Sequence, residues 1–439
     1  MRILKFFLQL ILVTIIQSCG ENIPGILNNV PTSSTVIVDA SGSGDYLTLQ
    51  DAISSGSIDI SIKNGTYEID ETIVITKDNI TIIGESNSGV KIIQKDPEKD
   101  LLIIRSDYFT LKNVTLDTLT NNAQAALVEG GGNYALVEDN IIKGGNKTFA
   151  LFFAGPPVSS VGSNCEGCVN ADETIEAYLE RDTEFRLSKS NIIKSNSISS
   201  DFVGDGVSCS LQQDGEFSSN IIHGGMISVY MDKDTIIKDN QFINSLQSGI
   251  YISLPSENLT ISGNYISNPR LHGIVMKPQY KEHGHINENI ISENILISEN
   301  IIQANVNGIN LQGYDDDHNS WGVAQKIEIK DNILHQFDFA GIWLFDLKES
   351  MISHNTINFG GEFNEELITC NSTTRGSQNG DIPLISSRES AGIYLYDDLE
   401  SIVILDNKIN KHNNCNVEEV MQNAISIGFG TNYDADISQ

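Results

Sequence analysis

Two short segments hold most of the side chains that are suited to acid-base chemistry. Lys277 is followed by a polar stretch that contains Lys281, and residues 315–318 read Asp-Asp-Asp-His. Proton abstraction beside a sugar carboxylate needs a base, and it needs a cation or polar group to stabilise the enolate-like intermediate. We therefore select Lys277, Asp316 and His318 as candidate catalytic residues, with Lys281 as a further candidate base.

Carboxylates in the same part of the sequence are the hard oxygen ligands that Ca²⁺ prefers. The candidate calcium ligands are Asp315, Asp317, Asp346, Asp397 and Asp398. A calcium ion held by them would stabilise the negative charge that develops on the substrate. Acidic runs in loops are more often solvated turns, so a purely structural interpretation competes with this one. Pairs of carboxylates from the set Asp316, Asp346 and Asp397 would instead suit glycoside hydrolysis.

A repeated strand motif must position these residues. Five segments share the pattern Gly-Ile-x-apolar, and they begin at Gly249, Gly273, Gly308, Gly341 and Gly392. Because side chains alternate along a strand, the Ile and the apolar residue two places later point inward, and their neighbours point outward. Stacking the segments predicts an exposed surface with these substrate-binding candidates: Tyr251, Asn310, Gln312, Trp343, Phe345, Tyr394 and Tyr396. Exposed aromatic rings are typical of surfaces on which sugars stack.

The spacing of the motif predicts two long loops beside this surface. The step from Gly273 to Gly308 is 35 residues and the step from Gly308 to Gly341 is 33 residues, whereas plain repeats in this chain are 20 to 24 residues long. The additional residues follow the strands directly, at 278–289 and 313–325. Long loops on a rigid scaffold commonly carry function. We therefore expect both loops to form walls of one glycan cleft.

A second repeat indicates the fold class. An asparagine returns after short segments rich in Ile and Val, at positions 140, 196, 220, 240, 264, 300, 332, 355 and 407. The segments alternate apolar and polar residues, which is strand patterning, and a fixed period of this length is typical of stacked repeats. The sequence therefore predicts an all-β fold, a right-handed single-stranded parallel β-helix over residues 35–439. Stacked asparagines at a bend of each coil can form ladders of side-chain amides.

The open ends of a solenoid need covering. The best candidate for a short N-terminal capping helix is the segment 45–56, with Asp45 as the cap residue. Leu47, Ala52 and Ile53 would be its buried side chains.

The beginning of the sequence predicts export and a lipid anchor. A basic start, a short apolar run and the segment Ile-Gln-Ser-Cys ending at Cys19 resemble a bacterial lipobox. We expect residues 1–18 to be a lipoprotein signal peptide, Cys19 to carry the lipid and residues 19–34 to be a tether. The expected location is the cell envelope, at the periplasmic face of a membrane or at the cell surface. The lipid would be the sole contact with the membrane.

Export permits disulfide bonds. Cys370 and Cys415 lie in polar, loop-like sequence, and we predict that they pair. Cys165 and Cys168 would form a local bridge, or one of them would pair with Cys209. The net charge of −31 is spread along the chain and would repel phosphates, so we expect no nucleic-acid partner.

The N-terminal hundred residues resemble a known enzyme family. The segments 38–46, 62–68 and 80–85 are similar to the opening of pectin methylesterases, which belong to the pectin-lyase-like β-helix group. The resemblance implies the β-helix fold. It does not extend to esterase activity, because Lys147 stands where that family has a catalytic Asp, and its Gly-Arg-Pro-Trp segment is missing.

Three function classes fit these observations. The preferred hypothesis is lyase or C5-epimerase chemistry on the uronates of an acidic polysaccharide, and the segment at Asp315 to His318 loosely resembles the Asp-Pro-His segment of alginate epimerases, without the proline. The alternatives are non-catalytic glycan binding or adhesion, and glycoside hydrolysis by paired aspartates.

Overall fold

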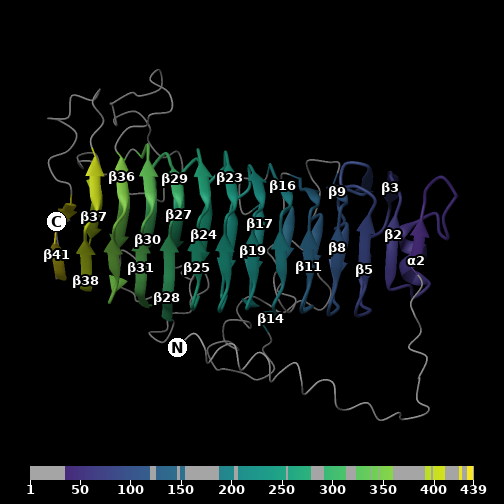
Figure 1. Cartoon of the computed structure of the whole chain (residues 1–439), viewed down its shortest axis with the longest axis horizontal. Coiled ribbons are helices and arrows are strands. Elements are labelled where there is room, and N and C mark those ends of the chain that lie inside the picture. Colours follow the sequence, from purple (N-terminus) through teal and green to yellow (C-terminus); the bar gives the residue numbers. More distant parts are fainter. Residues whose placement is uncertain are drawn as a thin grey trace, which may run out of the picture. The chain divides into compact units, whose positions relative to one another are not determined.

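Parallel strands of successive coils stack in three long sheets (Figure 1). The computed structural model describes residues 35–118, 125–145, 149–153, 187–201, 206–253, 256–277, 291–312, 323–337, 339–345, 347–358, 391–396, 399–410, 425–427 and 433–438. The coils wind right-handed, as nearly all crossovers between parallel strands do. One continuous hydrophobic core extends from Val38 to Ile404. The predicted right-handed parallel β-helix is therefore confirmed.

Each sheet takes one strand from most coils, and we name the sheets A, B and C. Sheet A contains β1 (Val36–Val38), β2 (Asp59–Ile62), β5 (Thr81–Gly84), β8 (Thr110–Lys112), β11 (Leu136–Glu138), β15 (Ile192–Lys194), β19 (Glu216–Ser218), β22 (Ile236–Lys238), β25 (Thr260–Ser262), β28 (Ile291–Ser298), β31 (Val323–Lys330), β34 (Leu347–Lys348), β35 (Met351–Ser353), β38 (Leu399–Leu405) and β41 (Tyr433–Ser438). Sheet B contains β3 (Gly65–Ile69), β6 (Val90–Gln94), β9 (Thr115–Thr118), β12 (Ile141–Lys143), β16 (Ser197–Ser199), β20 (Ile221–His223), β23 (Gln241–Ile243), β26 (Tyr265–Ser267), β29 (Ile301–Gln303), β32 (Ile333–His335), β36 (Thr356–Asn358) and β39 (Lys408–Asn410).

Sheet C carries the strands with the Gly-Ile motif. It contains β4 (Ile73–Ile75), β7 (Leu102–Ile104), β10 (Leu127–Glu129), β13 (Leu151–Phe153), β17 (Val207–Ser210), β21 (Ile227–Tyr230), β24 (Ile250–Ser253), β27 (His272–Lys277), β30 (Asn307–Gln312), β33 (Ala340–Phe345), β37 (Ala391–Tyr396) and β40 (Ile425–Ile427). A short additional pair is formed by β14 (Ser188–Lys189) and β18 (Gln212–Gln213).

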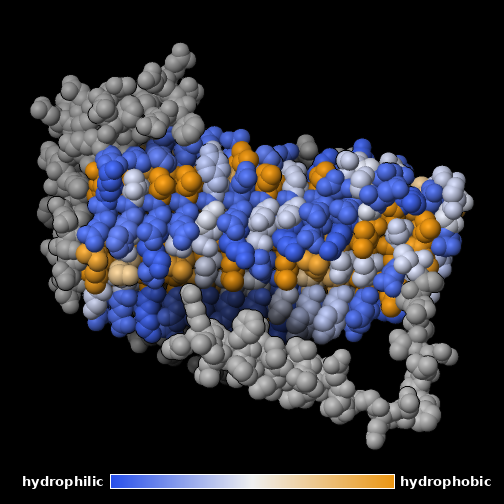
Figure 2. Space-filling view, viewed as in Figure 1, coloured by the Kyte–Doolittle hydropathy of each residue, from blue (hydrophilic) through white to orange (hydrophobic). Residues whose placement is uncertain are grey.

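The core follows from strand alternation combined with exact stacking of like side chains. In sheet A, Phe217, Ile237 and Ile261 pair in register from one coil to the next, and each is at most 1% exposed. Full burial of one such side chain contributes roughly 1.5–3 kcal/mol. On the outside, apolar residues form narrow bands on a largely hydrophilic face (Figure 2). The alternation in the sequence is therefore realised coil after coil.

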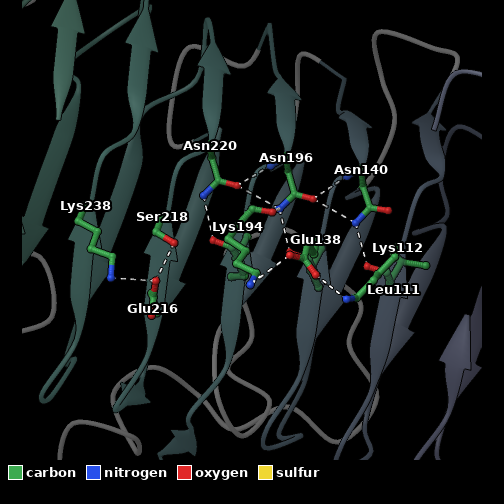
Figure 3. Close-up of polar contacts among 12 residues, drawn as sticks. Leu111, Lys112, Glu138, Asn140, Lys194, Asn196, Glu216, Ser218, Asn220 and Lys238 are labelled. Carbon is green, nitrogen blue, oxygen red and sulfur yellow. Dashed lines mark hydrogen bonds and ion pairs between the residues drawn. The ribbon is translucent and has the colours of Figure 1, made fainter. Parts of the chain in front are cut away.

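The repeated asparagines form the predicted amide ladder (Figure 3). Asn196 Nδ2 donates to Asn220 Oδ1 at 3.0 Å, and Asn220 Nδ2 donates to Asn240 Oδ1 at 3.1 Å. The same contact links all nine asparagines from Asn140 to Asn407. Each ladder residue follows a residue with positive φ, for example Asp239 at 55°, which turns the chain from sheet A into sheet B. The ladder thus satisfies polar groups at the buried bends of the coils from Asn140 to Asn407.

A second ladder, of opposite charges, lies on the outer face of sheet A. Glu138 lies between Lys112 and Lys194 on the adjacent coils, with Nζ to Oε distances of 2.5 and 3.1 Å (Figure 3). The hydrogen bond from Lys112 is the main cause that lowers the pKa of Glu138. Ion pairs near the surface contribute little stability. Their main effect here is that opposite charges, rather than like charges, lie next to each other on adjacent coils.

The N-terminal cap differs from its prediction in two details. The helix α2 spans Leu49–Ser54, and its N-cap is Thr48, whose Oγ1 accepts the backbone N–H of Asp51 at 3.1 Å. The predicted cap residue Asp45 instead accepts the backbone N–H of Ile37 at 2.8 Å. Leu47 is 58% exposed, so its predicted burial is wrong. The helix begins three residues later than predicted, and Leu49 takes the place in the core that Leu47 was expected to fill.

Among the described residues, α2 is the one helix, and none there is long and apolar enough to cross a membrane. Cys209 is a free thiol on β17 inside the core, and burial raises the pKa of its thiol. The alternative in which Cys209 pairs with Cys165 or Cys168 is therefore wrong. Val207 and Val229 surround the same part of the core, which suits Cys209 as a small apolar side chain.

One acidic side chain is enclosed by the protein. Asp232 is fully buried, its Oδ1 accepts the backbone N–H of Gln212 at 3.1 Å, and its Oδ2 has no hydrogen bond within the described part of the chain. Burial raises the pKa of Asp232 well above its usual range. The folded state therefore holds this proton more tightly than the unfolded state does. The penalty of the buried charge is absent below the unfolded pKa and grows as the pH rises above it.

The substitution Asp232→Asn tests this burial. It keeps the acceptor for Gln212 and removes the charge, so we expect the melting temperature at pH 8 to rise by about 2–4 °C. The gain should vanish near pH 4, close to the unfolded pKa of about 3.9. Thermal unfolding at both pH values measures it, and the exposed Asp239→Asn is the matched control. A loss of stability at pH 8, or an equal effect at both pH values, would contradict the assignment.

Candidate functional site

The outer face of sheet C brings the predicted strand residues into register. Five residues pair in series across β24, β27, β30, β33 and β37, and we call them the middle row: Tyr251, Val275, Asn310, Trp343 and Tyr394. A second set follows two positions later on the same strands, and we call it the end row: Ser253, Lys277, Gln312, Phe345 and Tyr396. The structure therefore places Lys277 on the same face as Trp343, two strands away.

Packing confirms that Trp343 and Tyr394 point away from the core. Ile342 and Leu344 belong to the main core, whereas the intervening Trp343 belongs to a separate cluster with Tyr394 and Ala340. This outer cluster is closed by Phe339, whose ring centroid lies 5.4 Å from that of Trp343 and 5.2 Å from that of Tyr394. The aromatic residues of the site therefore pack against one another in a cluster that is separate from the main core.

The predicted exposure of this face is wrong for its centre. Asn310 is 1% exposed, Tyr394 5% and Trp343 7%. Phe345 in the end row is also buried, at 4%. The aromatic rings pack edge-on against one another, which removes apolar area from water. Tyr251, Lys277 and Gln312 are half-buried, so the face combines a closed centre with partly open flanks.

The motif glycines add a third row that the sequence reasoning missed. A Cβ at Gly273 would lie 2.1 Å from Cγ2 of the core residue Ile302, so this position faces inward, as the next residue, Ile274, also does. Two successive inward positions reverse the alternation, and the residue before the glycine therefore shares the outer face with the middle row. We call these residues the start row: His272, Asn307 and Ala340. In the sequence, this row can be recognised as the residue that directly precedes each Gly-Ile pair.

His272 is held in one protonation state. The backbone N–H of Ala340 donates to Asn307 Oδ1 at 3.0 Å, so Asn307 Nδ2 is the group that lies 3.3 Å from His272 Nδ1. An amide nitrogen can only donate, so Nδ1 accepts and the ring proton is on Nε2. Burial, with a smaller effect of the Lys277 charge, lowers the pKa of His272 to about 3. His272 is therefore neutral at neutral pH and is a hydrogen-bond donor through Nε2.

The electrostatic character of this face contrasts with the rest of the chain. The sequence carries 58 Asp and Glu against 27 Lys and Arg. The described strands β24, β27, β30 and β33 carry no acidic residue at all, and Lys277 supplies a positive charge among amide and indole groups. Gln312 Nε2 donates to Asn310 Oδ1 at 3.3 Å, which links the end row to the middle row. The face is suited to a ligand rich in hydrogen-bond acceptors or negative charge.

Several predicted residues lie outside the described part of the chain: Cys19, Asp315, Asp316, Asp317, His318, Asp346, Cys370, Asp397, Asp398 and Cys415, together with the side chain of Tyr396. Their roles in catalysis, calcium binding, lipidation and the disulfide stay predictions. Within the described residues, no group of three His, Cys, Asp or Glu side chains is arranged to hold a metal ion. The described part of the site therefore consists of Lys277 and uncharged polar and aromatic groups.

Comparisons with known proteins agree with this architecture. A family model described as the right handed beta helix region matches residues 183–296. The Dettilon tailspike protein is similar in structure, with a TM-score of 0.54 and 12% identity over 90% of this chain, which spans 65% of that protein. The A-module of the mannuronan C-5 epimerase AlgE4 from Azotobacter vinelandii has a TM-score of 0.51 and 14% identity, over 89% of this chain and 94% of the module. No curated protein matches the sequence. At these identities the likenesses show the fold alone, a right-handed parallel β-helix.

Proposed function

We propose that this protein binds an acidic polysaccharide along the outer face of sheet C and acts on its uronate residues by lyase or C5-epimerase chemistry. The observation that carries the proposal is the alignment of Lys277, Gln312 and Trp343 on one acid-free face. Neighbouring strands are about 4.8 Å apart, so three coils cover roughly 10 Å, a length of about two sugar units. A mannuronan C-5 epimerase module has a similar fold, which supports the proposal that this scaffold can carry such chemistry. The similarity does not identify the substrate or the catalytic residues.

The proposed reaction begins with the hydrogen on C5 of a uronate. The ammonium of Lys277 first loses its own proton to solvent. The resulting amine then takes the C5 proton, and the electrons of the C5–H bond move into the carboxylate to give an enolate-like intermediate. In a lyase, these electrons then form the C4=C5 double bond, the C4–O4 bond breaks, and O4 takes a proton from the Lys277 ammonium or from water as it leaves. In an epimerase, C5 instead receives a proton on the opposite face. Hydrogen-bond donors around the carboxylate stabilise the intermediate in both cases.

Calcium remains a separate part of the proposal. The predicted ligands Asp315, Asp317, Asp346, Asp397 and Asp398 would hold the ion, which would supply positive charge to the substrate carboxylate. Assays in the presence of calcium chloride and of a chelator therefore belong to the same experiment.

A screen of pectate, alginate and glycosaminoglycans separates the possible activities. A lyase produces ultraviolet absorption from its new double bond, and an epimerase incorporates deuterium at C5 from heavy water without cleavage. A hydrolase releases reducing ends without ultraviolet absorption, and a binding protein only retards the polymer in a native gel. Ultraviolet absorption or C5 exchange would support the proposal. Hydrolysis, binding without reaction, or no interaction with any of these polymers would overturn the proposed chemistry.

We further propose that Cys19 anchors the protein to a membrane through a lipid, based on the lipobox-like segment that ends at this residue. The variant Cys19→Ala should lose lipid processing, because it has no thiol to carry the lipid. Without acyl chains to hold it in the bilayer, the protein should move from the membrane fraction to the soluble fraction. Detergent phase partitioning measures this, with Cys209→Ala as a control that keeps the lipobox. Unchanged membrane partitioning of Cys19→Ala would contradict the anchor.

A further inference from the structure

Two neighbouring hydrogen-bond donors in the middle row have no acceptor. Asn310 Nδ2 and Trp343 Nε1 are both buried, and neither makes a hydrogen bond within the part of the chain that the structure describes. The two residues pair directly in register across β30 and β33. Buried donors without acceptors destabilise a fold and are rare in native structures. Two of them side by side on a candidate binding face indicate that a ligand supplies the acceptors.

The surrounding contacts hold both side chains in place. Gln312 Nε2 donates to Asn310 Oδ1 at 3.3 Å, so the oxygen of the Asn310 amide is occupied and its nitrogen points elsewhere. The indole of Trp343 is held edge-on by Phe339 and by Tyr394, with ring centroids 5.4 and 6.4 Å away. Both donor atoms are buried, so the groups that cover them must shift before a ligand can reach them.

The chemistry of the pair selects the class of ligand. An indole N–H donates only, and the free nitrogen of the Asn310 amide also donates only, so the ligand group must present at least two acceptors. No acidic residue occurs in the described strands β24, β27, β30 and β33, and Lys277 adds a positive charge in the end row. A planar carboxylate offers two acceptor oxygens and a negative charge, and hydrogen bonds to an ionised acceptor are the stronger kind.

We propose that Asn310 Nδ2 and Trp343 Nε1 bind the carboxylate of a uronate residue, as a two-donor clamp on adjacent coils. This inference rests on the proposed function and specifies which groups of the protein bind the carboxylates of the polymer. The clamp places the carboxylate over the middle row. Lys277 is then left in the end row, one strand from Asn310, where it can reach the sugar carbon next to that carboxylate.

The test compares a uronate polymer with its carboxyl-reduced counterpart, in which each carboxylate is a primary alcohol. Trp343→Phe keeps an aromatic ring and removes the N–H, and Asn310→Leu replaces the amide by an apolar side chain of similar size. Each variant should bind the uronate polymer about tenfold more weakly or worse, because a hydrogen bond to a charged group is lost. Binding of the reduced polymer should change less than about twofold for Asn310→Leu. Phe339→Leu, which disturbs packing and removes no donor, should weaken both polymers equally.

The outcomes separate the clamp from the proposed function. If the wild-type protein binds none of the acidic polymers, both are wrong. If it binds them but Trp343→Phe and Asn310→Leu lose no preference for the charged polymer, the clamp is wrong and polysaccharide binding stands. The melting temperature without ligand is a further check, because Asn310→Leu removes the unsatisfied Nδ2, and the half-buried Gln312 that loses its acceptor can bond to water instead, so the melting temperature should stay unchanged or rise. A fall of several degrees would show that the amide has a structural partner, and it would overturn the clamp.

Discussion

Replacement of Lys277 by methionine is expected to lower turnover of a uronate polymer by about a hundredfold to ten-thousandfold, the usual contribution of general base catalysis. Methionine keeps an unbranched chain of similar length and removes the amine. Lys277 is half-buried at the end of β27 and lies outside the core, so the urea midpoint of the variant should stay near that of the wild type. Initial rates on the polymer identified by the screen, with urea unfolding followed in parallel, measure both quantities.

Two further variants separate a base from a simple positive charge. Lys277→Arg keeps the charge, but a guanidinium does not lose its proton in a protein, so it cannot act as the base. We expect it to be as inactive as Lys277→Met. Lys238→Met removes a lysine that pairs with Glu216 on sheet A, and it should keep the wild-type rate. Substantial activity in Lys277→Arg would assign this residue to charge stabilisation, and full activity in Lys277→Met would remove it from the mechanism.

The largest stability loss is expected for Asn264→Ala in the middle of the asparagine ladder. Asn264 Oδ1 accepts both the backbone N–H and the Nδ2 of Asn240 at 3.0 Å, and its own Nδ2 donates to Asn300 Oδ1 and to the carbonyl of Ile237. The substitution leaves several of these groups buried without partners, each at a cost of about 1–3 kcal/mol. We expect a total loss of roughly 3–6 kcal/mol, measured by urea unfolding.

A matched control distinguishes the ladder from a general effect of truncation. Gln241 also carries a side-chain amide, and it directly follows a ladder asparagine in the sequence. Its side chain is exposed on β23. Gln241→Ala should change the free energy of unfolding by less than about 0.5 kcal/mol. If Asn264→Ala has an equally small effect, water has replaced the lost contacts and the ladder contributes little.

The fold was largely predictable because it depends on local repetition. Period-two alternation predicted the strands, in which Ile237 and Ile261 are found in the core, and the recurring asparagine marked a bend of the coils that carry it. The capping helix was less predictable, because Thr48, three residues beyond Asp45, is also of a type that caps helices, although a weaker one than Asp. Choosing between two nearby caps depends on which leucine reaches the core, and this is a property of the assembled coils.

The sequence predicted how the strands of the candidate site align, but it did not predict how deeply their side chains are buried. The Gly-Ile motif aligned Asn310 with Trp343 correctly, since parallel pairing carries one strand's spacing onto the next. Trp343 packs against Phe339, which precedes the motif and has no periodic signal of its own. His272 was missed because simple alternation assigns it to the core side, and the inward glycine reverses that assignment. Sequence patterns thus locate a row of side chains, whereas the neighbours that enclose it depend on three-dimensional packing.

The asparagine ladder also bears on how such a protein can change in evolution. Neighbouring ladder residues are separated by only 20 residues between Asn220 and Asn240, but by 56 between Asn140 and Asn196 and by 52 between Asn355 and Asn407, and the amide contact is the same in all three. Closing a longer loop costs little extra, about 0.6 kcal/mol for each doubling of its length. Inserted segments can therefore lengthen, shorten or be exchanged between coils without disturbing the stacking. New specificities can arise by loop replacement while the scaffold stays unchanged.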